Sequence, residues 1–179
     1  MDDIVRQAMA KWPHVPDCYG WLALDDRGDW YLRDDCTQAL GAFDSGVPGA
    51  KGTVLRHDKL LGFIARNYGC DASGCWYFQN GPQRVFVDLQ TTPLIARLHD
   101  DGHVCDHLGR PLSWHASWVD EAGRLYLQGQ TLAQVHSQDM HLAADWIEAG
   151  RIDPKSIEQG SLPERFGFVR RPRPAKLLQ

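Results

Sequence analysis

The stretch Asp71-Ala-Ser-Gly74-Cys-Trp76-Tyr77-Phe78 shows the pattern from which the fold of this chain can be read. An Asp followed three residues later by Gly suits a tight turn, because the carboxylate accepts backbone N–H bonds and Gly adopts a positive φ. In the triplet that follows, the two apolar side chains share one face of a strand and the Tyr lies on the other. The stretch therefore predicts a β-hairpin.

The same pattern occurs twice more without gaps, as Asp25-x-x-Gly28-x-Trp30-Tyr31-Leu32 and as Asp120-x-x-Gly123-x-Leu125-Tyr126-Leu127. Such turns are common, so chance is one explanation for three copies. The Tyr that stands in register in every copy favours duplication of one unit. A duplicated unit with a helix behind each sheet predicts an α+β fold of antiparallel β-hairpins.

Apolar residues at helical spacing predict helices at 3–12, 57–68 and 138–149. Asn80-Gly81 between two β-prone runs predicts another hairpin. Residues 33–53 are rich in acids, Gly and Pro, and this composition indicates a loop.

Near the end of the chain, Asp153-Pro154 predicts a turn of helix that Gly160 closes. The alternating residues 165–170 predict an edge strand. We expect an N-terminal α+β unit at 1–98, a second β-rich unit at 99–150 and a C-terminal segment at 151–179.

The composition limits the class of protein. Apolar residues make up 43% and charged residues 23% of 179 residues, which is enough for an ordinary core. No apolar run approaches the roughly 20 residues of a membrane span, and the acidic start is unlike a secretion signal. Five cysteines without a regular spacing fit a reducing compartment. We therefore expect a cytoplasmic protein with no membrane partner.

The net charge of −4 is unevenly distributed along the chain. The last 15 residues hold five basic residues and no acid, so the rest is strongly acidic. An acidic body argues against nucleic acid as a partner. The basic, Pro-rich tail at 170–176 either docks on an acidic patch, of this chain or of a partner, or is a disordered terminus.

Several stretches resemble a proteobacterial conserved family of unknown function of the DUF2946/DUF2944 type: Met1–Asp25 with Val15–Leu24 within it, Leu61–Tyr68, Gly74–Leu89 and, more weakly, Leu162–Val169. That family has no assigned activity, so the resemblance implies no catalytic residues. More distantly, the order of helix, Asp-x-x-Gly hairpin and Thr-Pro is similar to the DUF1285 family. That similarity implies repeated motifs of the kind found in pleckstrin-homology-like (PH-like) modules, and a role in signalling.

A group of His and Cys residues is a candidate metal site, for zinc above all: His99, His103, Cys105, His107 and His115. In an extended strand, alternate side chains share a face about 7 Å apart, which is wide for one tetrahedral ion unless a bend gathers them. The alternative is a set of scattered surface imidazoles. Cys70 and Cys75 are either a redox pair across a hairpin or two buried thiols.

Aromatic side chains on the hairpins are candidates for a ligand-binding face, with Arg84 as an anion contact. The residues are Trp76, Tyr77, Arg84 and Tyr126. The alternatives are core packing for the rings and a solvated charge for the arginine.

Motifs for nucleophilic catalysis and phosphate binding are missing from the sequence. We therefore expect a non-enzymatic binding or regulatory module for a protein, peptide or small molecule, with a homodimer through an edge strand as one assembly. The alternative is a metal-binding protein or metal-dependent enzyme that uses residues 99–115.

Overall fold

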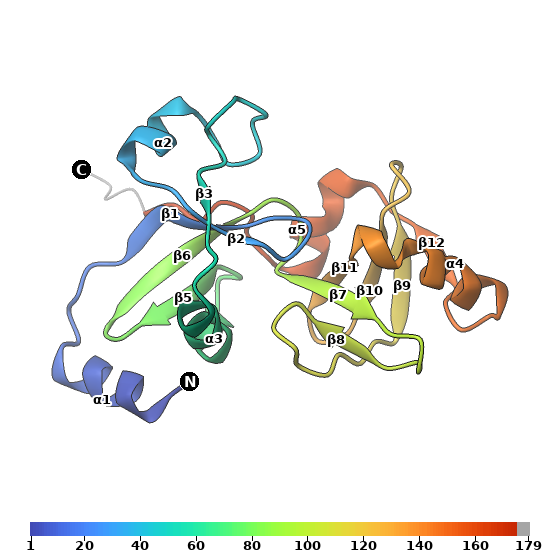
Figure 1. Ribbon diagram of the computed structural model, residues 1–179, viewed down its shortest axis with the longest axis horizontal. Coiled ribbons are helices and arrows are strands. Elements are labelled where there is room, and N and C mark those ends of the chain that lie inside the picture. Colours follow the sequence, from blue (N-terminus) through green and yellow to red (C-terminus); the bar gives the residue numbers. More distant parts are fainter. Residues whose placement is uncertain (175–179) are drawn as a thin grey trace. The chain divides into compact units, whose positions relative to one another are not determined.

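The structure, a computed structural model, describes residues 1–174 and shows two compact units (Figure 1). The first unit contains residues 1–25, 29–90 and the described chain from 169, and the second contains 26–28 and 91–168. Each unit is built on a six-stranded sheet with short helices. The α+β class is confirmed.

The first sheet has the strand order β3-β2-β1-β6-β5-β4. Its strands are β1 Cys18–Leu24, β2 Trp30–Leu32, β3 Thr53–Val54, β4 Tyr68–Cys70, β5 Trp76–Asn80 and β6 Gln83–Leu89. The helices of this unit are α1 Asp3–Lys11, α2 Asp35–Leu40 and α3 Asp58–Asn67.

The second sheet has the strand order β12-β9-β10-β11-β7-β8. Its strands are β7 Leu94–Leu98, β8 Val104–Asp106, β9 Ala116–Val119, β10 Leu125–Gln128, β11 Leu132–Val135 and β12 Pro154–Ser156. Its α-helices are α4 Met140–Glu148 and α5 Leu162–Phe166, and its 3-10 helices are η1 Ser137–Asp139 and η2 Gln159–Ser161.

The predicted antiparallel hairpins are present, but both sheets are mixed and also contain parallel pairs, which the sequence did not predict. In the first sheet β1 pairs parallel with β6, and in the second β7 pairs parallel with β11 and β9 with β12. The antiparallel hairpins are blocks that these parallel pairs join. Local patterns specify a hairpin, but a parallel pair joins strands that are distant in the sequence.

The three predicted turns each connect two antiparallel strands, and their glycines have φ between +76° and +83°. In the turn that begins at Asp71, its Oδ1 accepts the N–H groups of Ser73 and Cys75 at 2.9 Å. The turn at Asp120 repeats this arrangement. A further copy, Asp106 to Gly109, has the same carboxylate bonds.

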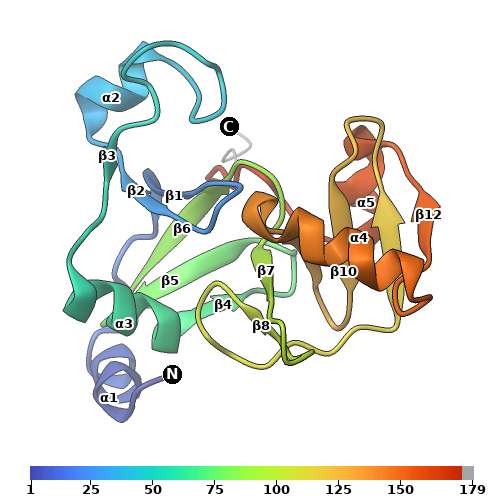
Figure 2. The ribbon, with the colours of Figure 1, turned by 45° about the vertical axis from the view of Figure 1, so that its right-hand side comes forward.

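A helix packs on each sheet. In the first unit α3 lies against β5, where the rings of Phe63 and Phe78 meet edge to face at 5.4 Å. In the second unit α4 lies over the sheet (Figure 2), and its Ala143 and Trp146 are buried in one core cluster with residues of β7, β10 and β11. The three long helices predicted from periodicity are all present.

Three local predictions were wrong. The segment 33–53 contains α2, which Asp34 caps by accepting the Thr37 N–H at 2.8 Å. Residues 154–156 form β12 and not a turn of helix; Pro154 opens this edge strand, where its missing N–H costs little. The edge strand expected at 165–170 does not form: its first two residues end α5, Gly167 follows at φ +66°, and within this stretch Val169 alone makes a β-bridge, with Cys75.

The described part of the basic tail docks on acidic side chains of the first unit. Arg170 contacts Asp44 at 3.0 Å, Arg171 pairs with the same carboxylate, and Arg173 lies 3.0 Å from Asp88. This is the docked alternative. Lys176 lies outside the described residues.

Within residues 1–174, no helix combines the length and the apolar character that crossing a membrane requires.

Candidate functional site

Of the residues predicted to form an aromatic face, Trp76, Tyr77 and Arg84 lie in the first unit. Trp76 is buried and its ring packs 4.8 Å from that of Tyr68. Arg84 is paired with Asp17 at 2.6 Å, and its guanidinium lies 5.9 Å from the Tyr77 ring. The Arg84 charge is therefore already satisfied by a carboxylate.

Tyr126 belongs to the second unit and is fully buried. Its hydroxyl donates to Asp120 Oδ2 at 2.7 Å. Burial, together with this bond to an anion, raises the pKa of Tyr126. In this position the ring belongs to the core of the second unit.

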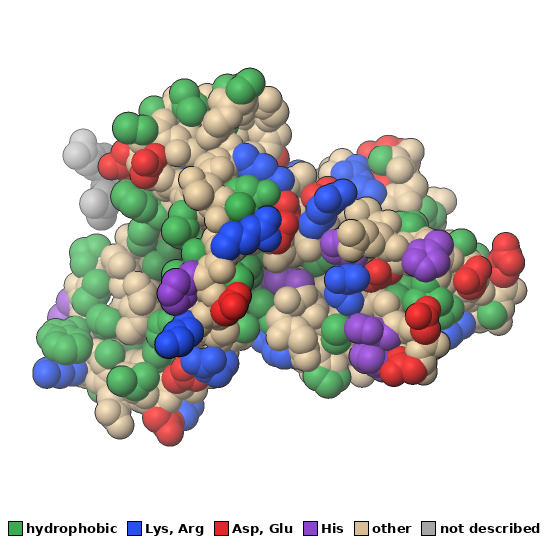
Figure 3. Space-filling view, viewed as in Figure 1, with side chains coloured by type: hydrophobic (Ala, Val, Ile, Leu, Met, Phe, Trp, Pro, Cys, Tyr) green, Lys and Arg blue, Asp and Glu red, His purple; other side chains and the backbone are tan. Residues whose placement is uncertain are grey.

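The structure brings together three of the five predicted metal ligands, at the end of the β7–β8 hairpin. We call this group, His99, His103 and Cys105, the hairpin cluster. One ligand atom from each lies within 4.8 Å of the others, and His99 Nε2 is 3.3 Å from Cys105 Sγ. The imidazole rings of His99 and His103 are stacked at 3.9 Å. Figure 3 shows histidine side chains gathered beside acidic ones on the surface.

The other two predicted ligands lie elsewhere in the second unit. His107 Nδ1 accepts the Ile95 N–H at 3.2 Å. His115 is exposed and lines a separate cavity of about 510 Å³ beside Trp114. The strand β8 is only three residues long and ends at Asp106. His107 therefore lies outside the strand, and the alternation of side chains along it does not place His107 on the face of Cys105.

Charged residues surround the hairpin cluster. Arg97, which pairs with Cys105 across the hairpin, contacts Asp139 at 2.7 Å. Burial by itself would raise the pKa of Asp139, but the bonds from Arg97 and the Leu98 N–H hold it below its usual value. Burial raises the pKa of the Cys105 thiol, so at neutral pH it is mainly protonated while no metal is bound.

Cys70 and Cys75 of the first unit are not directly opposite each other in their hairpin. Cys70 is opposite Trp76 in the β4–β5 register, so Cys75 is displaced by one position. Both thiols are free, and burial raises the pKa of each.

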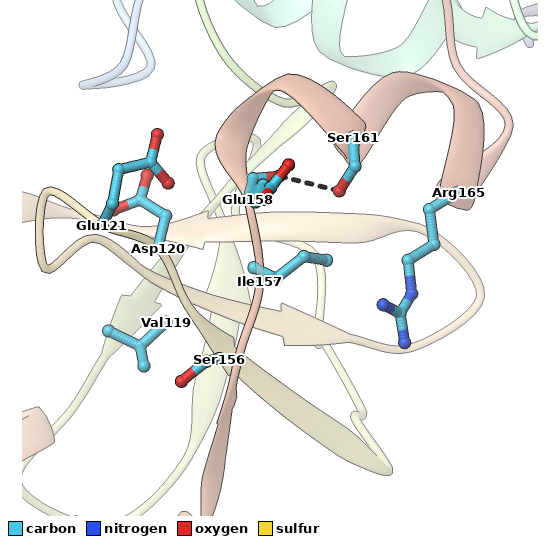
Figure 4. Close-up of a pocket in the computed structure, with 8 residues that line it drawn as sticks. All are labelled: Val119, Asp120, Glu121, Ser156, Ile157, Glu158, Ser161 and Arg165. Atoms are coloured by element: carbon cyan, nitrogen blue, oxygen red, sulfur yellow. Dashed lines mark hydrogen bonds between the residues drawn. The ribbon is translucent and has the colours of Figure 1, made fainter.

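A second candidate site is an open cavity of about 590 Å³ in the second unit, which we call the charged cavity (Figure 4). Its walls come from the end of β9 and the turn after it, from β12 and the residues that follow, and from η2 and α5. The lining residues are Val119, Asp120, Glu121, Ser156, Ile157, Glu158, Ser161 and Arg165.

The parallel pairing of β9 with β12 builds this cavity. Ile157 N–H donates to Val119 O at 3.0 Å, and Gln159 N–H donates to Glu121 Oε2 at 3.0 Å. These bonds hold the two acidic walls side by side. The Ser161 hydroxyl donates to the Glu158 carbonyl at 2.7 Å.

Charge is separated across the charged cavity. Glu121 and Glu158 are exposed, whereas Asp120 is buried and engaged within its own turn. Arg165 lies away from Glu121 along the cavity in Figure 4. Its guanidinium rests 4.1 Å from the centre of the Trp118 ring. The cavity thus offers carboxylates at one end and a cation at the other.

The family model described as "Protein of unknown function (DUF2946)" matches residues 1–173. The chain belongs to this family. This match confirms the resemblance that was read from the sequence. The description of the family assigns no activity to the DUF2946 protein. No curated protein matches it.

Two solved structures are similar to this DUF2946 protein. A DUF1285 family protein from Silicibacter pomeroyi DSS-3 is 11% identical, with 72% of this chain and 69% of that chain covered and a TM-score of 0.47. A DUF1285 family protein from Shewanella baltica OS155 is 13% identical, with 70% and 91% covered and a TM-score of 0.41. Structural similarity to DUF1285 proteins is what the sequence resemblance predicted.

Sequence reasoning missed the residues of the charged cavity in this DUF2946 protein. Glu121, Glu158 and Arg165 come from segments that only the parallel β9–β12 pair brings together. The one local signal was Leu162-Pro163 followed by Gly167, the Pro-first and Gly-last order of a short helix, which would have placed Arg165 on α5.

Proposed function

We propose that this protein is a ligand-binding module, and that its charged cavity holds a small zwitterionic molecule, such as a free amino acid or a short peptide. The observation that carries the proposal is the separation of Glu121 and Glu158 from Arg165 across one cavity.

The size of the cavity supports a small organic ligand. A volume of about 590 Å³ lies within the range of roughly 300–1,000 Å³ that is usual for small-molecule sites. It exceeds the needs of a single bound ion. Val119 and Ile157 supply apolar contact in its lining for the uncharged part of a ligand.

The charges support a ligand that carries both signs. An ammonium group would bind the carboxylates of Glu121 and Glu158, and a carboxylate would bind Arg165 through its planar pair of N–H donors. Stacking on Trp118 restricts the guanidinium of Arg165 before a ligand arrives, which lowers the entropy cost of binding. A ligand with only negative charge would be repelled by Glu121 and Glu158, and a ligand with only positive charge would be repelled by Arg165.

A binding experiment tests this directly. We expect dipeptides with free termini to raise the thermal unfolding midpoint and to give heat in calorimetry, whereas the N-acetylated or C-amidated forms bind at least about 10-fold more weakly, because each loses a charge-assisted contact. Arg165→Gln should weaken binding of the free dipeptide by a similar factor.

The matched control is Glu164→Gln, which changes an exposed neighbour of Arg165 on α5 that does not line the cavity. It should bind as the unaltered chain does. Equal binding of free and capped dipeptides, or no binding of either, would refute the proposal.

A regulatory role of this module, a PH-like arrangement of its hairpins, and a protein, peptide or second copy as partner stay predictions. The recurrence of the Asp-x-x-Gly turn in both units supports the repeated hairpins from which the first two predictions start.

A further inference from the structure

We infer that the hairpin cluster of His99, His103 and Cys105 is a binding site for a divalent transition metal of the zinc class. This inference is independent of the charged cavity. It narrows the five candidate ligands of the sequence to three and gives each a place in the β7–β8 hairpin.

The spacing of the ligand atoms fits one ion. Bond lengths of about 2.0–2.1 Å to nitrogen and 2.3 Å to sulfur in a tetrahedral zinc site place the two atoms roughly 3.5 Å apart. His99 Nε2 and Cys105 Sγ are 3.3 Å apart, and all three ligand atoms lie within 4.8 Å.

The donor set selects the class of metal. A thiolate with two imidazoles suits zinc, cobalt and copper, whereas magnesium and calcium prefer oxygen ligands. On binding, the Cys105 thiol releases its proton and the thiolate becomes the ligand.

Asp101 prepares His103 for this role. The Asp101 carboxylate lies 2.5 Å from His103 Nδ1, and since a carboxylate only accepts, that nitrogen carries the proton. His103 Nε2 is then free to bind a metal. A carboxylate behind a ligating histidine is the usual outer partner of such sites.

The hairpin holds the cluster in place before a metal arrives. His99 N–H donates to His103 O at 3.1 Å, and Gly102 turns the chain at φ +89°. Arg151 donates to the Gly102 carbonyl, and its guanidinium stacks 3.7 Å from the Trp146 ring of α4. Arg151 therefore links the turn at Gly102 to helix α4.

Three protein ligands leave one position of a tetrahedral ion to water or another molecule, unlike a closed structural site with four. His103 is exposed and the other two are partly buried, so the ion is reached from solvent. We therefore expect an exchangeable ion, and not one on which folding depends.

Cobalt titration of the chain without an affinity tag, after removal of metals by chelator, tests the inference. We expect one equivalent of Co²⁺ to give a thiolate-to-cobalt charge-transfer band and strong visible absorption of a tetrahedral site. One equivalent of Zn²⁺ should abolish both. Far-ultraviolet circular dichroism should be the same with and without metal.

Variants then locate the site. Cys105→Ala should remove the charge-transfer band. His103→Gln, at an exposed position, should weaken metal binding by more than about 100-fold, because removal of a direct ligand costs more affinity than removal of a residue that only hydrogen-bonds to a ligand. Asp101→Asn should cost about 10-fold. The matched controls are Cys36→Ala and His115→Ala, which change an exposed thiol and an exposed imidazole outside the cluster.

A folded chain with no charge-transfer band at one equivalent would overturn the inference. So would a band that persists in Cys105→Ala, or one that Cys36→Ala removes. If Cys105→Ala fails to fold, the exposed His103→Gln variant decides the question by its affinity.

Discussion

Arg33→Ala is expected to destabilise the first unit by about 3 kcal/mol, because it breaks a buried ion pair from one side. The side chains of Arg33 and Asp88 are each 2% exposed, with Nη1 3.5 Å from Oδ2. Arg33 also donates to the carbonyls of Ala50 at 2.9 Å and Gly41 at 2.6 Å. Among the described side chains, the variant leaves Arg173 as the remaining cation beside the buried Asp88 carboxylate, and it leaves the carbonyls of Ala50 and Gly41 without these donors.

Urea-induced unfolding followed by circular dichroism measures this loss. Arg56→Ala is the matched control: its side chain is 74% exposed and lies 3.7 Å from that of Asp29, so a loss below about 0.5 kcal/mol is expected. The double variant Arg33→Met with Asp88→Leu should recover much of the stability, because it removes both charges together. A loss below about 1 kcal/mol for Arg33→Ala would contradict the role assigned to this pair.

The burial of Arg33 and Asp88 is a feature of the first unit that could not be predicted from the sequence. The alternation of Val85, Val87 and Leu89 with Phe86 and Asp88 is the pattern of a strand with one core face, yet Phe86, Val87, Asp88 and Leu89 are all buried. The second face is covered by Arg33 and by Arg173 of the tail. A strand buried on both faces cannot be recognised from alternation, because its coverage comes from distant segments.

Local features were predictable for a physical reason. The turn at Asp71 is made by its own carboxylate and by Gly74, and both lie within four residues. The helix 58–67 follows from periodicity, although its cap, His57 Nδ1 on the Leu60 N–H, was not foreseen. The parallel pairs of both sheets were missed because nothing near those strands specifies a partner tens of residues away.

The two candidate sites differ in the same way. The hairpin cluster spans seven residues, and the sequence named its three members among five candidates; His107 follows the end of β8, and His115 lies elsewhere in the second unit. The charged cavity depends on the pairing of β12 with β9. The sequence did not predict this pairing, because residues 154–160 were expected to form a turn of helix. A group of side chains within one hairpin can be read from sequence, whereas a group that comes from distant segments requires the fold.

Asp120→Ala is the second large effect, with an expected loss of about 3 kcal/mol from the removal of several hydrogen bonds at a buried carboxylate. Asp120 Oδ1 accepts the N–H groups of Ala122 and Arg124 at 2.9 Å, and Oδ2 accepts Arg124 Nε at 2.8 Å and the Tyr126 hydroxyl at 2.7 Å. The variant leaves the hydroxyl of a fully buried tyrosine without this acceptor.

Asp106→Ala is the matched control, because its turn has the same two backbone bonds and an arginine, Arg110, but no tyrosine hydroxyl. We expect it to cost about 1 kcal/mol less than Asp120→Ala, and Tyr126→Phe to cost about 1 kcal/mol by itself. Equal losses for the two Asp variants would show that the tyrosine bond contributes nothing.

The pH dependence of the Asp120→Ala loss tests the charge itself. Burial alone would raise the pKa of Asp120, but the Arg124 N–H, the Tyr126 hydroxyl and the Arg124 charge lower it below its ordinary value. A carboxylate with a lowered folded pKa contributes stability that is complete above its unfolded value of about 3.9 and is lost as the pH falls through the folded pKa. The difference in unfolding free energy between the unaltered chain and Asp120→Ala should therefore be constant from pH 7 to about 5 and shrink towards about pH 3. A difference that grows on acidification would mean that burial, and not the bonds from Arg124 and Tyr126, dominates at this carboxylate.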